Sequence, residues 1–217
     1  MRYLLALLSL AAWSCREIQP VDPVPEEITG YFVSGSVTSE SGVPLDSVQV
    51  RLWYNFEPSD LGPIDTAHVV VTDPTKVVDV VVMTPGGDFV RQLYLNYRQP
   101  GPVPRFQWDF YDSHGNFAPS GVYIVRYAFD TVVVKSERRI IQGTPTALTD
   151  ASGHFTLGMD RLPVGDVFDI YTVQNQYAGP YFVLPRIDME FSKGSLFGAA
   201  TIDLQLNRIT TAAFTVR

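Results

Sequence analysis

Apolar and polar residues alternate with a period of two along most of this chain, which is the pattern of β-strands with one buried face. The alternation is clear in residues 31–37 and again in residues 48–54, where Val48, Val50 and Leu52 share one face with Tyr54. No segment shows the 3.6-residue period of an amphipathic helix. The sequence therefore predicts an all-β protein whose first two strands form a hairpin.

Similar short runs recur to the end of the chain, separated by clusters of glycine, proline, asparagine and aspartate, which favour turns. Pro85-Gly-Gly-Asp88 is one such turn, and the proline cluster at residues 99–104 is another break. Further strands are expected at residues 68–72, 76–84, 89–97, 131–141, 146–149, 154–157, 167–174, 181–187, 198–206 and 209–216.

Residues 106–127 are predicted to form a strand, a tight turn and a second strand. Asp112-Ser-His-Gly115 has a side-chain acceptor first and a glycine last, which is the composition of a four-residue turn. Trp108 and Tyr123, on either side, offer large apolar surfaces to a core. The run of β-branched and aromatic residues from 122 to 129 continues the second strand.

The first fifteen residues have the order of a bacterial signal peptide: one basic residue, an apolar run, and small residues before a cysteine. The apolar run of residues 4–12 is too short to span a bilayer as a helix, which needs about 20 apolar residues. Leu10-Ala-Ala-Trp-Ser-Cys15 resembles the bacterial lipobox, whose cysteine becomes the lipidated first residue of the mature protein. The alternative is a signal peptide that is cut elsewhere, with Cys15 removed.

The composition favours a folded protein that does not bind nucleic acid. The chain carries a net charge of −7 and no run of basic residues, so its surface repels nucleic acid. Aromatic residues make up 12% of the chain and charged residues only 18%, which indicates a substantial core rather than disorder. In residues 16–29, Pro20, Pro23 and Pro25 favour an extended tether between Cys15 and the first strand.

Two stretches in the middle of the chain carry a specific pattern. The first is residues 80–93, and the second contains Trp108-Asp109, Asp112, Gly115 and Pro119-Ser-Gly-Val-Tyr123. Over about residues 66–142 the chain resembles the immunoglobulin-like domain of the FlgD type, named for the flagellar hook-capping protein. The resemblance implies an accessory, spacing or binding module and no catalysis.

The flanking segments resemble a different module. Residues 33–52 are similar to the opening of carboxypeptidase-regulatory-like, or transthyretin-like, β-sandwiches, and residues 146–157 are similar to the hairpin that normally follows it. Here the FlgD-like segment lies between them. Because domain termini commonly lie close together at the surface, insertion of one domain into a loop of the other is the simplest arrangement.

The expected organisation is therefore two immunoglobulin-like β-sandwich domains, one inserted in a loop of the other. Residues 1–15 are the signal peptide, 16–29 the tether, 30–58 plus 144–217 the outer sandwich, and 62–142 the inserted domain. Trp53 shares the polar face of its strand, close to the point where the chain leaves for the inserted domain. We expect it to be largely buried, with the inserted domain as its cover.

The titratable residues form no recognisable metal-binding or catalytic pattern. Asp109, Asp112 and Asn116 lack the dense alternating oxygens of a calcium loop and are expected to cap their own turn. Asp166 and Asp169 have no spacing that places them in a cleft. The histidines are isolated and lack the paired spacing that presents two imidazoles to one metal; they are His68, His114 and His154.

No nucleophile elbow, phosphate-binding loop or dinucleotide fingerprint occurs, so no catalytic residue, metal ion or cofactor is expected. Aromatic side chains are the remaining candidates for contact with a partner, because they supply large area at low entropic cost. The candidates for contact with a glycan or a protein are Tyr94, Tyr97, Tyr177 and Tyr181. Packing within the protein is the alternative interpretation of each.

These observations favour a lipid-anchored, non-enzymatic protein of a bacterial cell envelope, in the outer membrane, that serves as a structural or protein-interaction module. Two alternatives stay open. One is a carbohydrate-binding module of a surface glycan-uptake system, which needs an exposed coplanar row of aromatic rings. The other is an accessory subunit of a secreted enzyme.

Metabolic labelling with palmitate tests the lipidation of Cys15. The wild-type chain is expected to incorporate the label and the Cys15→Ala variant to lose it, because stable anchoring needs the acyl chains that this residue carries. Label that persists unchanged in Cys15→Ala would contradict the prediction.

Overall fold

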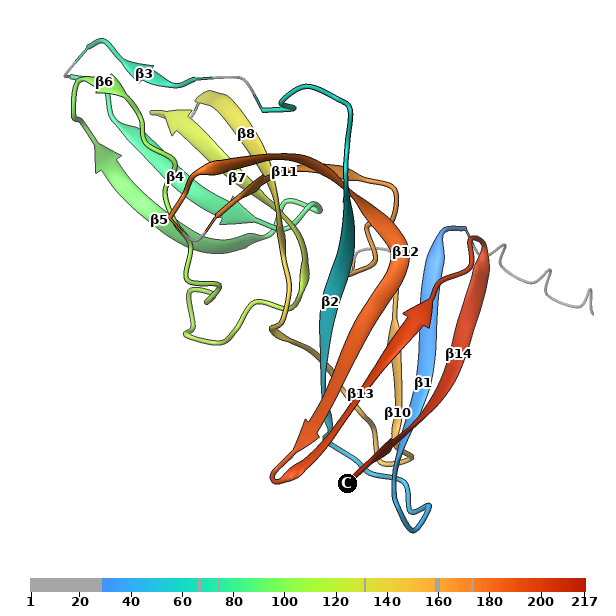
Figure 1. Cartoon of the computed structure of the whole chain (residues 1–217). Helices are drawn as coiled ribbons and strands as arrows, with labels where there is room; N and C mark the ends of the chain where they lie inside the picture. Colours follow the sequence, from blue (N-terminus) through green and yellow to red (C-terminus); the bar gives the residue numbers. More distant parts are fainter. Residues whose placement is uncertain (1–28, 66–67, 74, 131, 159–160, 173) are drawn as a thin grey trace, which may run out of the picture.

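The computed structural model describes residues 29–217 except residues 66–67, 74, 131, 159–160 and 173. The described part of the chain forms β-strands and no α-helix, which confirms the prediction of an all-β protein (Figure 1). The strands are β1 (Tyr31–Ser39), β2 (Gln49–Pro58), β3 (Val70–Val71), β4 (Val78–Met83), β5 (Phe89–Tyr97), β6 (Gly101–Pro102), β7 (Gly121–Phe129), β8 (Val132–Ile141), β9 (Pro145–Leu148), β10 (His154–Leu157), β11 (Val167–Tyr171), β12 (Tyr177–Lys193), β13 (Leu196–Asp203) and β14 (Arg208–Val216).

Strands from the two ends of the chain form a β-sandwich, which we call the first sandwich. One sheet has the order β10-β1-β14, and the other has the order β11-β12-β2-β9 with β13 also paired to β12. β1 lies between β10 and β14 and runs parallel to β14, and Gly30 and Asn207 exchange two hydrogen bonds at its start. The core between the sheets includes Val33, Val50, Leu52, Phe155, Phe168, Met189, Phe191 and Phe214.

The prediction that the first two strands form a hairpin is wrong. β1 belongs to the three-stranded sheet, whereas β2 pairs with β12 and β9 in the other sheet. β9 and β10 are divided between the two sheets in the same way. The alternating pattern requires only that each strand has one buried face, so it does not specify which strand lies beside it.

The middle of the chain forms a second packed unit, which we call the central unit. Its main sheet has the order β5-β4-β7-β8, and β3 pairs separately with β6. Trp108 is buried in its core, and the indole Nε1 donates to the carbonyl of Tyr111 at 2.8 Å. The Tyr123 hydroxyl donates to the carbonyl of Pro119 at 2.8 Å. The motif residues therefore hold the segment before β7 against the sheet.

The segment before the central turn is not the strand that the sequence predicts. Residues 103–109 have no regular secondary structure, and Phe110 has a φ of 65°, which is incompatible with a regular strand. The turn itself is as expected. Asp112 Oδ1 accepts hydrogen bonds from the amides of His114 and Asn116, both at 2.8 Å.

The buried apolar side chains gather in two clusters that follow this division. One cluster belongs to the first sandwich, and the other is formed by residues between 69 and 141. Val122 is an exception, because it packs in the cluster of the first sandwich. The division into two domains, one inserted in the other, stays a prediction, because packing alone does not show that either part folds by itself.

The register of β2 is as predicted, but Trp53 is more exposed than expected. Val50 and Leu52 are fully buried, whereas Trp53 on the opposite face keeps 38% of its surface exposed. The central unit lies beyond the end of β2 rather than over its outer face (Figure 1). The prediction that Trp53 is largely buried is therefore wrong.

Gly35 on β1 tests how tightly the first sandwich is packed. A Cβ added there would lie 2.4 Å from Cε1 and Cζ of Phe155 and 2.9 Å from the ring of Phe214. Because both rings are buried, Gly35→Ala is expected to lower the free energy of unfolding by about 1–3 kcal/mol, measured by denaturant unfolding. Gly62→Ala, where nothing lies within 4 Å, is the control. Equal losses in the two variants would contradict the packing argument.

Candidate functional site

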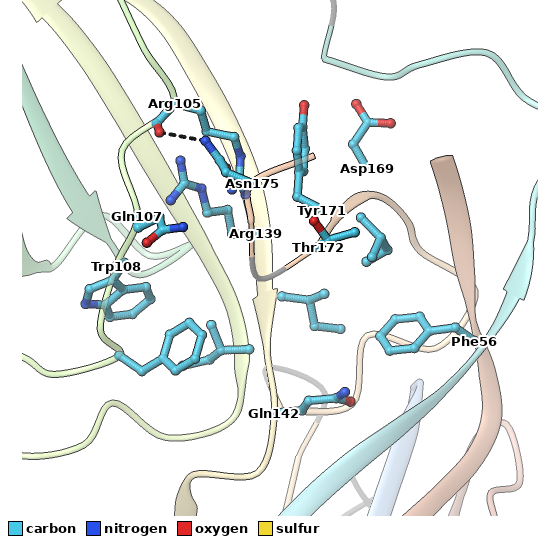
Figure 2. Close-up of a pocket in the computed structure, with 14 residues that line it drawn as sticks. Phe56, Arg105, Gln107, Trp108, Arg139, Gln142, Asp169, Tyr171, Thr172 and Asn175 are labelled. Atoms are coloured by element: carbon cyan, nitrogen blue, oxygen red, sulfur yellow. Dashed lines mark hydrogen bonds between the residues drawn. The ribbon is translucent and has the colours of Figure 1, made fainter. Parts of the chain in front are cut away.

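A cavity of about 490 Å³ lies where the two apolar clusters meet. Its apolar lining includes Phe56 from β2, Trp108 from the central unit, Ile140 from β8 and Ile170 from β11. The polar lining consists of Arg105, Gln107, Arg139, Gln142, Asp169, Tyr171, Thr172 and Asn175 (Figure 2). The cavity is therefore built by both packed units.

The charged centre beside this cavity is Glu137 on β8, which is 3% exposed. Its Oε1 accepts hydrogen bonds from Nε of Arg105 at 2.6 Å and from Nε of Arg139 at 2.7 Å. Its Oε2 accepts from Nη2 of Arg139 at 3.1 Å and from the Tyr127 hydroxyl at 3.3 Å. Arg139 also donates to the carbonyl of Phe106 at 2.6 Å. We call Arg105, Glu137 and Arg139 the junction cluster.

The surroundings of Glu137 and of its neighbour Tyr127 determine their protonation states. Burial raises the pKa of the Glu137 carboxyl, but the hydrogen bonds and charges of Arg139 and Arg105 outweigh burial and hold the pKa below its ordinary value of 4.5. Burial and the Glu137 charge raise the pKa of Tyr127 to about 12. At neutral pH Glu137 is ionised and Tyr127 is protonated, so neither group is tuned to transfer a proton there.

Arg105 connects the junction cluster to the first sandwich. Its Nη1 donates to Oδ1 of Asn175 at 2.8 Å, and Asn175 Nδ2 donates to the Arg105 carbonyl at 3.0 Å (Figure 2). Its guanidinium lies 3.9 Å from the centroid of the Tyr171 ring, a cation–π contact. Asn175 has a φ of 63°, a left-handed conformation that asparagine adopts more readily than most residues. The local turn between β11 and β12 therefore presents both Asn175 groups to Arg105.

Two further ion pairs join β8 to the first sandwich and its connecting segment. Arg138 pairs with Asp166, which precedes β11. Lys135 Nζ lies 3.0 Å from Oδ2 of Asp65, in the segment that follows β2, and both side chains are largely buried. The Asp65 amide in turn donates to Asp169 Oδ2 at 2.7 Å. Charged side chains of β8 thus contact the first sandwich at separate points.

Buried hydroxyl groups fix the place where the chain returns from the central unit. Ser120 is fully buried, and its Oγ lies 3.1 Å from the carbonyl oxygen and 3.2 Å from Oγ1 of Thr144. The Thr144 amide donates to the same Oγ at 3.3 Å. The Gly143 amide donates to the carbonyl of Leu52 at 2.7 Å. Ser120, in the motif Pro119-Ser-Gly-Val-Tyr123, therefore belongs to the junction between the two units.

The tyrosines that the sequence singles out do not form one binding face. Tyr97 is buried and packs edge-on against Tyr94, with ring centroids 5.4 Å apart and ring planes at 78°. Tyr177 is exposed on β12 and donates its hydroxyl to Asp169 at 3.3 Å. Tyr181 is half-buried farther along the same strand. These four residues do not make the coplanar row that a glycan platform needs.

The acidic residues of the central turn act on their own backbone and neighbours. The amide of Asn116 holds the pKa of the Asp112 carboxyl below its ordinary range, and the amide of His114 adds to this effect. Asp109 pairs with Arg91 at 3.1 Å. Within the described residues, no three His, Cys, Asp or Glu side chains are placed to hold a metal ion.

Nothing in the sequence spacing places Asp166 or Asp169 at a cleft, yet Asp169 lines the cavity. Its two oxygens accept hydrogen bonds from the amide of Ile64, at 3.1 and 3.0 Å, and Oδ2 also accepts from Asp65. Asp169 therefore holds the segment that leaves the first sandwich.

The junction cluster is the part of the site that the sequence does not reveal. Arg105 lies in the irregular segment before Trp108, far in sequence from Glu137 on β8 and from Asn175 in the turn after β11. One feature of β8 does indicate the cluster. Glu137, Arg139 and Ile141 are buried at alternate positions of β8, so two charged residues occupy a face that ends in a core isoleucine.

Comparison with known proteins gives no match. No family model matches the chain, and no curated protein or solved structure matches it significantly. The resemblances to FlgD-type and transthyretin-like domains rest on the quoted motifs and stay predictions. Cys15 lies outside the described residues, so its lipidation stays a prediction too. In the described part of the chain, no helix is long and apolar enough to cross a membrane.

Glu137→Gln removes the negative charge between the two arginines while keeping the side-chain size. The free energy of unfolding is expected to fall by about 3 kcal/mol or more, because breaking a buried ion pair leaves an uncompensated charge. Urea unfolding at pH 7 measures the change. Glu57→Gln, at an exposed position of β2, is the control and should stay within about 0.5 kcal/mol of the wild type. Small effects at both positions would show that the cluster does not stabilise the fold.

The depressed pKa of Glu137 also predicts a pH dependence. The folded protein binds this proton more weakly than the unfolded chain, so the stabilisation is complete above the unfolded value of 4.5 and is lost as the pH falls through the lower folded pKa. The difference in unfolding free energy between the wild type and Glu137→Gln should therefore shrink as the pH is lowered below about 4.5. A difference that stays constant throughout the acidic range would contradict this account.

Proposed function

We propose that this protein is a lipid-anchored, non-enzymatic component of a bacterial cell envelope that acts as a structural or protein-interaction module. The observation that carries the proposal is the junction. Its charged groups are engaged with one another, and they tie the central unit to the first sandwich. Such an arrangement serves to hold two surfaces at a fixed angle.

The geometry of the junction supports a rigid connection. Arg105, Lys135 and Arg138 contact the first sandwich or its connecting segment at three separate points. The chain also crosses between the units twice, and a backbone amide is held at each crossing. The Asp65 amide donates to the Asp169 carboxylate, and the Gly143 amide donates to the carbonyl of Leu52. A hinge needs a few residues that are free to change their backbone angles, and these contacts restrain them.

The tether supplies the second half of the proposal. Residues 16–29 separate Cys15 from the first described strand, and an extended proline-rich segment of that length reaches about 40 Å. A lipid at Cys15 would therefore hold the first sandwich near a membrane surface while leaving room for a partner. The net negative charge of the chain directs it away from nucleic acid.

The two other functions that the sequence leaves open receive different support. The separation of Tyr94 and Tyr97 from Tyr177 and Tyr181 gives no support to a glycan platform at these residues. An accessory role beside a secreted enzyme needs the same rigid presentation of surfaces. Identification of the protein that is captured with this chain distinguishes this role from a structural one.

Small-angle X-ray scattering tests the rigid connection. The double variant Arg105→Ala/Arg138→Ala is expected to have a larger radius of gyration and a broader distance distribution than the wild type, because two of the three contact points are lost. The control is Arg186→Ala/Arg208→Ala, two arginines that neither line the cavity nor join the units. Unchanged scattering from the junction variant would contradict the proposal, and so would a wild-type chain that does not fractionate with membranes in a Cys15-dependent manner.

A further inference from the structure

A lysine of the central unit and an aspartate of the segment after β2 meet at the edge of the junction. Lys135 lies on β8, paired in register with Tyr127 of β7. Its Nζ is 3.0 Å from Oδ2 of Asp65, and the two side chains keep only 15% and 14% of their surface exposed. Neither residue is among those that line the cavity. The contact therefore joins two distant parts of the chain at a place of its own.

This contact lacks the alignment of a hydrogen bond. Asp65 Oδ2 is buried, and among the described residues it has no hydrogen-bond donor, although Lys135 Nζ is well within hydrogen-bonding distance. The pair formed by Lys193 and Asp46 is different. There Nζ donates to Oδ1 at 2.6 Å, and the side chains are 38% and 59% exposed. The buried pair thus brings nitrogen and carboxylate together without the hydrogen bond that the exposed pair makes.

Both groups are held in place by their surroundings. The Asp65 amide donates to Asp169 Oδ2 at 2.7 Å, and the Ile64 amide donates to both oxygens of the same carboxylate. Lys135 Nζ lies 5.3 Å from the centroid of the Tyr127 ring. Well-oriented groups of one molecule react with effective molarities that reach about 10⁵ M or more. An amine held in this way competes successfully with water for the carboxyl carbon.

We propose that Lys135 and Asp65 form an amide bond, a covalent link between β8 and the segment that leaves the first sandwich. One proton first passes from the ammonium to the carboxylate and gives a neutral amine and a neutral acid. Burial favours this neutral pair, because it penalises the charged form of each group.

The remaining steps need no other reactant. The Nζ lone pair attacks Cγ of Asp65, and the bond from Cγ to one carboxyl oxygen breaks. That oxygen leaves as water and takes a second proton from the nitrogen, so the nitrogen keeps one hydrogen in the amide. Nothing is oxidised or reduced. The inference goes beyond the proposed function, which needs a fixed junction but no covalent bond in it.

The test is mass spectrometry of the purified full-length chain after denaturation and digestion with trypsin. Trypsin cuts after lysine and arginine but not after an amidated lysine, so the bond should join residues 52–76 to residues 127–138. The joined peptide is expected to weigh one water molecule less than the sum of its two parts. Fragmentation should place the link at Lys135 and Asp65.

Lys135→Arg is the matched variant, because it keeps the positive charge but carries a guanidinium that does not lose its proton in proteins. Residues 52–76 should then be released unjoined and at full mass, and Asp65→Ala should likewise release the peptide that contains Lys135. Far-UV circular dichroism verifies that both variants are folded. Within the wild-type digest, the peptides that carry Asp46 and Lys193 are the internal control and should stay separate.

The inference is overturned if the wild-type digest releases residues 52–76 unjoined and at full mass, or if fragmentation places the link at other residues. It is also overturned if the loss of one water persists in Lys135→Arg, as a succinimide at Asp65 would give. Peptide masses depend neither on membrane attachment through Cys15 nor on scattering by the whole chain. This inference and the proposed function therefore fail separately.

Discussion

The arrangement of the two units depends on one buried carboxylate. Glu137 lies between Arg105 and Arg139 with almost no access to water, and a charge in that position must be paired within the protein. Apolar contacts alone tolerate small shifts of one surface over another, whereas charge-assisted hydrogen bonds have fixed directions. The position of Arg105, and through it that of Asn175, follows from this requirement.

The same requirement explains why the protein has two apolar clusters and a cavity between them. The strand that carries Glu137 and Arg139 stands between the clusters, and hydrocarbon side chains cannot close over groups that need polar partners. The space that remains is lined by isoleucine and aromatic side chains together with amides and guanidinium groups. Its shape is therefore a product of electrostatics as much as of packing.

The sequence predicts what is local to a strand and fails where distant parts of the chain meet. The buried face of β2 is evident from Val48, Val50 and Leu52, since alternation is a property of the strand itself. The partner of β1 is not evident, because β14 comes from the opposite end of the chain. The sequence places Trp53 on the correct face, but its exposure depends on where the central unit lies. Likewise, Arg105 gives no sign in the sequence that it reaches Glu137 and Asn175.

The position of β1 has a mechanical consequence. It is the first strand of the described chain, and it is bonded on one side to β10 and on the other, in parallel, to β14. A force that pulls the first residue of β1 along the strand axis would load the hydrogen bonds on both sides in shear, all at the same time rather than one after another. Gly30 and Asn207 take up the load first. The pairing of β1 on both sides therefore lets the first sandwich resist a force that pulls at this end of the strand.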